Sequence, residues 1–222
     1  MADLSAFETA SITEGAQGRC QDKVAVTTAS DRVVIAVADG AGGSGGGEEA
    51  AATVVDRIGN LATEARNGEW WSAGLGRIDL EVGTGQSTGV VVELSANRIC
   101  GASVGDSRAW IVPGGQIVDL TASQQRKPLL GSGEARPVGF SYGPLDGLLV
   151  VATDGFCNYI KRPALFAATE VTGFSALPRR LVDLVRLPSG ALWDDVGIVV
   201  CRRKRPMTRY SGRIELAFED IR

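Results

Sequence analysis

Apolar residues along most of this chain alternate with polar ones or form short β-branched runs, a pattern that predicts a protein rich in strands. Turn residues such as Ser95-Ala96-Asn97 and Pro113-Gly114-Gly115 separate consecutive runs at hairpin distance, so much of the sheet is expected to be antiparallel. The expected strands are residues 23–27, 32–38, 87–94, 98–104, 108–112, 116–120, 148–153 and 196–202. The pattern disfavours a purely parallel, doubly wound fold.

Helical spacing of apolar residues appears in two segments. It runs from residue 47 to about residue 65, with Glu48 and Glu49 in the first turn, where they complement the helix dipole. A second helix is expected at residues 176–185, and shorter helical turns at residues 163–168 and near Trp70 and Trp71.

Residues 121–147 show no clear period and read as a long loop. Loops of that length inside a compact domain usually carry a function. Arg126, Lys127 and Arg136 lie in it and are suited to meet an anion, although solvated surface charges are the simpler interpretation.

The length of 222 residues fits one domain, expected at residues 1–202, followed by a tail at residues 203–222 that is basic at its start. With 23 basic and 26 acidic residues, the net charge of −3 gives no global attraction for nucleic acid. The basic run at residues 202–205 leaves a nucleic-acid adaptor as a less favoured alternative. No signal peptide or membrane span is expected.

The four cysteines are far apart in the sequence, without a C-x-x-C pair: Cys20, Cys100, Cys157 and Cys201. This spacing argues against a disulfide framework and a zinc site, so reduced thiols in a cytoplasmic protein are expected.

Aspartates stand where apolar runs end, in a chain without histidine. They are Asp22, Asp39, Asp106, Asp154 and Asp194, the last beside Asp195. Carboxylate and carbonyl oxygens suit Mg²⁺ or Mn²⁺, whereas zinc, copper and non-haem iron prefer imidazole or thiolate ligands. The leading interpretation is a metal-assisted reaction on a phosphate.

A glycine tract offers a competing interpretation. Gly40, Gly42 and Gly45 satisfy G-x-G-x-x-G after an expected strand and before a helix, as in dinucleotide-binding folds. Asp39 would then face a pyrophosphate, and the antiparallel strands downstream do not continue a βαβ series. The lysine of a P-loop is also missing. For the glycines alone, a flexible turn before a helix remains open.

Four segments follow one another in an order that resembles the metal-dependent protein serine/threonine phosphatases of type 2C. VVIAVADGAGG (33–43) resembles the strand ending in D-G-x-G-G, and GASVGDSRAW (101–110) the V-G-D-S-R-A strand pair. LVVATDG (149–155) resembles the S/T-D-G strand, and WDDVGIVV (193–200) the closing element of the family. Each motif alone is a common turn sequence, but together they point to a compact, bacterial-type member.

The resemblance implies an α+β fold, a four-layer α-β-β-α sandwich of two mainly antiparallel sheets flanked by helices. It also implies two Mn²⁺ or Mg²⁺ ions with a third, weaker one. Asp39 would bridge both ions and the Gly40 carbonyl would complete one site, while Asp154 and Asp194 would hold the other ion.

Two further acids receive roles through the same resemblance. Asp22 would act through metal-bound water, which makes it, with Asp39, a catalytic residue. Asp106 would bind the third ion together with Asp154, whereas its simpler interpretation is a turn residue that hydrogen-bonds its own backbone.

The chain departs from the family pattern at several positions. Ala41 replaces the histidine of eukaryotic members, and Gln21 replaces the usual glutamate. Gln17 stands where the family has its phosphate-gripping arginine, which leaves Arg19 as the nearest substrate-binding replacement. The stretch from Asp106 to Asp154 is short, so the flap beside the active site is expected to be reduced or absent.

The expected function is hydrolysis of phosphoserine or phosphothreonine by direct attack of a metal-activated water. The expected partners are a protein phosphorylated on Ser or Thr and a cognate kinase or its substrate, with no membrane or nucleic acid, for a cytoplasmic bacterial monomer. The alternative is a pseudophosphatase that binds phosphoproteins as a regulatory module. Retention of Asp39, Asp154 and Asp194 argues against it, because packed acids destabilise a fold that holds no cation.

Overall fold

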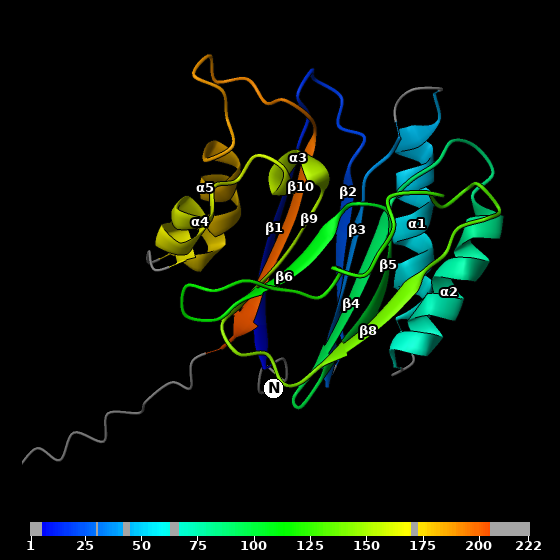
Figure 1. Cartoon of the computed structure of the whole chain (residues 1–222), viewed down its shortest axis with the longest axis horizontal. Coiled ribbons are helices and arrows are strands. Elements are labelled where there is room, and N and C mark those ends of the chain that lie inside the picture. The colour runs from blue at the N-terminus through cyan, green and yellow to red at the C-terminus, as the bar shows by residue number, and fades with distance from the viewer. Residues whose placement is uncertain (1–5, 30, 42–44, 63–66, 170–172, 205–222) are drawn as a thin grey trace, which may run out of the picture.

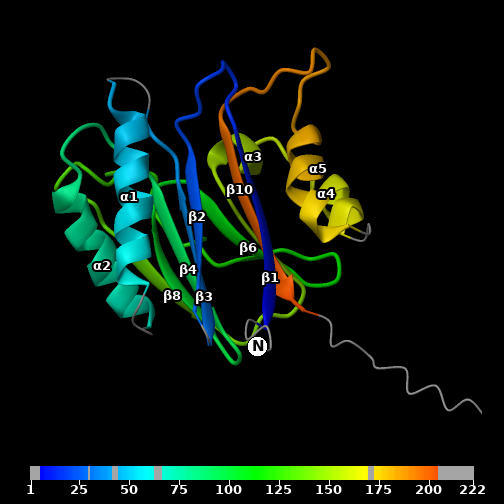
Figure 2. The ribbon, with the colours of Figure 1, turned by 180° about the vertical axis from the view of Figure 1, so that it is seen from behind.

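The computed structural model describes residues 6–29, 31–41, 45–62, 67–169 and 173–204. It contains two five-stranded sheets packed face to face, with helices on both outer faces (Figures 1 and 2). Sheet A has the order β1-β10-β9-β6-β7 and sheet B the order β2-β3-β4-β5-β8. Neighbouring strands in both sheets are antiparallel, so the expected four-layer α+β sandwich is confirmed.

The elements have the following bounds. Sheet A consists of β1 (Phe7–Glu14), β6 (Arg108–Val112), β7 (Val118–Asp119), β9 (Leu148–Ala152) and β10 (Val196–Arg203). Sheet B consists of β2 (Lys23–Thr28), β3 (Arg32–Ala38), β4 (Gly89–Ser95), β5 (Ile99–Val104) and β8 (Val138–Tyr142). The helices are α1 (Gly47–Leu61), α2 (Gly68–Glu81), α3 (Asp154–Cys157), α4 (Arg162–Thr169) and α5 (Leu177–Asp183).

The core has three apolar layers. One lies between the sheets, a second between sheet B and helices α1 and α2, and the third between sheet A and helices α4 and α5. Strand β3 shows how the sequence produces this arrangement: Val33, Ile35 and Val37 belong to the layer between the sheets, and Val34 and Ala36 to the layer under the helices. Because both faces of the strand are buried, its sequence is a continuous apolar run rather than an alternating one.

Several expectations drawn from the sequence were wrong in extent. Strands β1 and β8 were not expected, and residues 116–120 form only the two-residue strand β7. Both β1 and β8 lie at a sheet edge, where polar outward-facing residues dilute the apolar pattern. The loop expected at residues 121–147 therefore contains a strand.

The helices also differ from expectation. Helix α2 spans fourteen residues instead of a short turn near its tryptophans, because Gly74 and Gly76 weaken its helical signal. Helix α1 ends at Leu61, and residues 63–66 lie outside the described part of the chain. Helix α5 is preceded by a separate 3-10 turn, Phe174–Ala176.

The segment after Lys127 is ordered by a buried carboxylate on α2. Oδ1 of Asp79 accepts backbone hydrogen bonds from Gly131 (2.7 Å), Ser132 (3.1 Å) and Gly133 (3.1 Å), and Oδ2 accepts one from Ala135 (2.9 Å). Asp79 is only 4% exposed, so these charge-assisted bonds are shielded from water. The carboxylate thereby fastens the loop to sheet B's helical layer.

Replacing Asp79 with Ala is expected to lower the free energy of unfolding by about 2–3 kcal/mol, since the backbone donors it satisfies would lose a charged acceptor. Urea unfolding followed by circular dichroism measures this. Asp56→Ala on the exposed face of α1 is the matched control, with an expected change within about 0.5 kcal/mol. Equal stability of the two variants would contradict the anchoring role.

Candidate metal centre and active-site cavity

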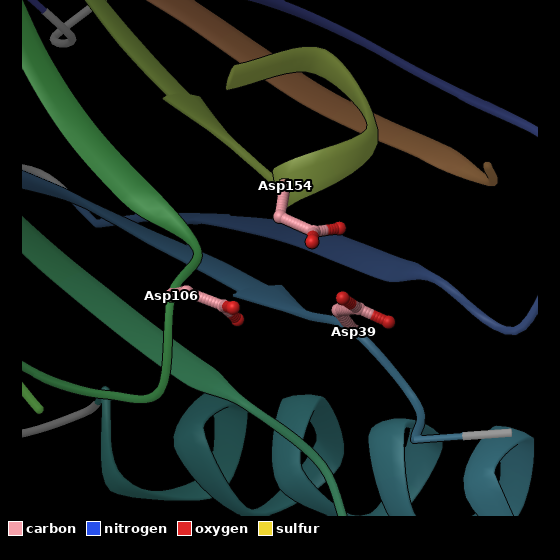
Figure 3. A group of neighbouring side chains, drawn as sticks. All are labelled: Asp39, Asp106 and Asp154. Carbon is pink, nitrogen blue, oxygen red and sulfur yellow. The ribbon is translucent and has the colours of Figure 1, made fainter. Parts of the chain in front are cut away.

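Asp39 is held by its own backbone at the end of β3. Its N–H donates to Thr88 Oγ1 (2.9 Å), and its carbonyl oxygen accepts from Thr88 N (2.9 Å) and Ser87 Oγ (2.9 Å). These bonds fix the main chain while the carboxyl group points away from the strand toward Asp154 (Figure 3). The main chain that carries the Asp39 side chain is therefore held in place by three hydrogen bonds.

Gly40 lets the next stretch of chain pass close to the start of α1. A Cβ at this position would stand 2.3 Å from the carbonyl oxygen of Gly47, which no other residue type can tolerate without moving the backbone. The close approach explains part of the glycine tract structurally. Gly42, which the dinucleotide interpretation needs, lies outside the described residues.

Three of the predicted acids meet in space. Asp39 follows β3, Asp106 lies in the turn between β5 and β6, and Asp154 begins α3 directly after β9. Each contributes a carboxylate oxygen to a group whose members all lie within 4.8 Å of one another, as Figure 3 shows. Since β3 and β5 belong to sheet B and β6 and β9 to sheet A, the group lies where the two sheets meet.

Asp22 and Asp194 lie around this group. Asp22 precedes β2 and is only 2% exposed, and its charge acts on Asp39. Asp194 is exposed and lines a cavity together with Asp39 and Asp154. Its neighbour Asp195 lines the same cavity and also stabilises the fold, because its two carboxylate oxygens accept the N–H groups of Ala16 (2.8 Å) and Gln21 (2.6 Å).

The acids raise one another's pKa. Burial, followed by the charges of Asp22, Asp154 and Asp194, raises the pKa of Asp39 to about 9. Burial also raises the pKa of Asp22 to about 7, and burial with the charges of Asp106 and Asp194 raises that of Asp154. Without a cation these carboxyl groups are therefore held in an environment that opposes their ionisation.

The residues present fit a hard divalent cation. The ligand atoms are oxygens, which suits Mg²⁺ or Mn²⁺. In addition, Asp22 Oδ2 and Gln21 Oε1 are buried without a hydrogen-bond partner within the described residues. Buried polar atoms normally have partners, so these two are available to a cation or to its bound water.

Two adjoining cavities open over the acids and share Asp39, Ala41 and Asp154. The first, of about 520 Å³, also contains Asp106, Arg126 and Lys127. The second, of about 380 Å³, extends toward Arg19, Trp193 and Asp194. A larger cavity of about 640 Å³ lies between α2 and β8, away from all these acids. Chemistry, rather than volume, therefore identifies the site.

Arg126 is a cavity residue that the sequence did not assign. Its Nε lies 2.7 Å and its Nη2 2.6 Å from Asp106 Oδ2, so this largely exposed side chain pairs with one of the acids of the site. Lys127 lines the same cavity, whereas Arg136 contributes to neither cavity over the acids. No periodicity reveals this placement, because it depends on how the loop folds back over sheet B.

The second cavity has a different rim. Arg19, the proposed substrate-binding residue, is 86% exposed in its side chain and pairs through Nε with Glu48 Oε2 at 2.5 Å. Trp193 is 62% exposed and stacks on Tyr159 with ring centroids 5.8 Å apart.

The basic run at the end of β10 is engaged by the fold. The guanidinium of Arg202 contacts Glu8 at 2.5 Å and lies 4.5 Å from the ring centroid of Phe174. Arg203 donates to the carbonyl oxygens of Leu145 and Ala96. These contacts weaken the nucleic-acid adaptor alternative. Residues 205–222, most of the expected tail, lie outside the described part of the chain.

Comparison with known proteins supports the resemblance found in the motifs. The Protein phosphatase 2C family model matches residues 12–82, which include Asp22, Asp39 and Gly40. No curated protein is a significant match to the chain. Within the described residues, no helix is both long and apolar enough to cross a membrane.

Solved structures that are similar to this chain include bacterial phosphatases. A bacterial serine phosphatase superposes with a TM-score of 0.78 at 16% identity, covering 89% of this chain and 98% of that one. The serine/threonine phosphatase Stp1 from Staphylococcus aureus gives 0.76 at 17% identity, with 90% and 96% covered. The serine/threonine phosphatase PstP from Mycobacterium tuberculosis gives 0.71 at 18% identity, with 90% and 99% covered. At these identities the comparison establishes the fold.

The metal-free protein is expected to lose stability between about pH 4, near the pKa of an unfolded aspartate, and pH 9, near the pKa of Asp39 in the folded protein. The pKa values of Asp39 and Asp22 are raised in the folded state, so the folded protein binds more protons than the unfolded chain in this range, and stability falls as pH rises. Thermal melts in chelator should show a falling Tm, and Asp39→Asn should show a smaller fall. A Tm that rises over this range in wild type would contradict the assignment.

Proposed function

We propose that this chain, which shares its fold with bacterial serine/threonine phosphatases and matches the type 2C family over residues 12–82, is a metal-dependent phosphoprotein phosphatase. The observation that carries the proposal is the meeting of Asp39, Asp106 and Asp154 from three separate loops, with carboxylate oxygens within 4.8 Å. A group of acids this close is costly to a fold unless cations neutralise it.

The residues suited to hold two Mn²⁺ or Mg²⁺ ions are Asp39, the Gly40 carbonyl, Asp154 and Asp194. Asp39 is proposed for the position shared by the two ions, and it borders both cavities, as Asp154 also does. Asp106 is suited to a third, weaker ion together with Asp154. When bound, such ions lower the pKa of a bound water and offset the negative charge of a phosphate.

The chain's own side chains have complementary tasks. Asp22, with its unpartnered Oδ2, is placed to accept a hydrogen bond from a water and to orient it. Ala41 lines both cavities but has no proton to donate, and the chain contains no histidine. Protonation of the leaving group therefore falls to water or to a protonated acid. Arg19, at the rim, is proposed to meet the phosphoprotein.

The proposed substrate is a protein phosphorylated on serine or threonine, such as a cognate kinase or a substrate of that kinase. The exposed rim around Trp193 leaves room for a protein chain, in contrast to a closed small-molecule pocket. We further propose that the protein acts in the cytoplasm as a monomer, through a catalytic domain at residues 1–202 with a tail at residues 203–222. No observation favours a pseudophosphatase that only binds phosphoproteins.

Wild-type protein with Mn²⁺ is expected to hydrolyse p-nitrophenyl phosphate and a phosphothreonine peptide, and chelator should abolish both reactions. Asp39→Asn should lower kcat by at least about 100-fold, because it removes a charged ligand at the shared position. Release of p-nitrophenol and of phosphate measures this. Asp31→Asn, at an exposed position just before β3, is the control. Asp195→Asn is unsuitable because the Asp195 carboxylate stabilises the fold. Equal rates for all proteins, with or without chelator, would contradict the proposal.

A further inference from the structure

The carboxylate of Asp106 already has a cationic partner within the protein. Both Nε and Nη2 of Arg126 approach the same oxygen, Asp106 Oδ2, at 2.7 and 2.6 Å. The same carboxylate belongs to the group formed with Asp39 and Asp154. The charge of Arg126 also acts on Asp154, whose pKa it lowers against the larger effect of burial. The positive charge of the Arg126 guanidinium therefore acts on the same two carboxylates, those of Asp106 and Asp154, that would share a bound cation.

The loop that carries Arg126 is fastened on both sides of it. Before Arg126, the carbonyl oxygen of Gln125 accepts from Gly105 N (3.2 Å), and Nε2 of Gln124 donates to the Ser107 carbonyl (2.7 Å). After it, Leu130 exchanges two backbone hydrogen bonds of 3.0 Å with Ser87. Arg126 is thus presented to Asp106 by the fold rather than by chance contact of a free loop.

We propose that Arg126 is an internal counter-cation for Asp106, and that a metal ion bound by Asp106 and Asp154 must displace it. This inference rests on the proposed function, because it concerns the weakest of the three proposed ions. It assigns Arg126 as a positioning residue that sets how readily the third site fills, while its charge acts on the tighter ions only at a distance, through Asp154.

The competition is expected to be moderate. The side chain of Arg126 is 78% exposed, whereas that of Asp106 is 18% exposed. Exposed ion pairs are weak and screened by salt, so removing the guanidinium should tighten the third ion about threefold to tenfold. Arg126 would tune this site without closing it.

The test counts bound Mn²⁺ by electron paramagnetic resonance of the free ion in titrations of wild type and Arg126→Ala. The third ion should bind about threefold to tenfold more tightly to Arg126→Ala, a larger change than for either of the two tighter ions. Lys127→Ala is the matched control, since it removes the same charge from the same cavity but leaves the ion pair between Arg126 and Asp106 in place. It should tighten the third ion by less than about twofold.

A second pair of variants isolates the contact itself. In an Asp106→Asn background, adding Arg126→Ala should leave the Mn²⁺ titration unchanged, because the carboxylate for which Arg126 and the metal ion compete is absent. Equal shifts in Arg126→Ala and Lys127→Ala, or no shift in either, would overturn the inference while wild-type Mn²⁺ binding and hydrolysis still support the proposed function. A wild type that neither binds Mn²⁺ nor hydrolyses phosphate esters would overturn both.

Discussion

Mutual repulsion among buried carboxylates is the constraint around which this molecule is built. Asp22, Asp39 and Asp154 each have a pKa raised first by burial, and the charges of Asp22 and Asp154 raise the pKa of Asp39 further. A flexible main chain would let the acids move apart and would thereby relieve the repulsion between them. Here β3 is buried on both faces and the Asp39 backbone is bonded to Thr88 and Ser87, so the repulsion persists until a cation relieves it.

The sandwich architecture explains how residues so far apart in sequence converge. Asp39 comes from the end of a sheet B strand, and Asp154 from the end of a sheet A strand. Asp106 lies in the connection that carries the chain from one sheet to the other. Packing the two sheets through one apolar layer brings these three loops together, so that their side chains are neighbours (Figure 3). The apolar contact between sheets is therefore also what assembles the acids.

The sequence predicted what local pattern can encode. Strands buried on both faces, such as β3 and β9, were found because their apolar runs stop at an acid. Edge strands β1 and β8 were missed because one side of each is polar. The position of Arg126 was also missed, since it depends on a loop fastened by Asp79 from another layer of the fold. The division of labour between Asp194 and Asp195 likewise appears only in three dimensions.

The close approach at Gly40 limits how mutation can change the cavity that contains Asp39 and Asp194. Next to Asp39, the chain faces the start of α1 through main-chain atoms, with a Cβ at Gly40 only 2.3 Å from the Gly47 carbonyl oxygen. Every residue type has the same main-chain atoms. A substitution at Gly40 therefore cannot change the chemistry of this part of the wall unless helix α1 also moves. Divergence in substrate preference is thus left to the walls built from side chains, such as the one bearing Lys127.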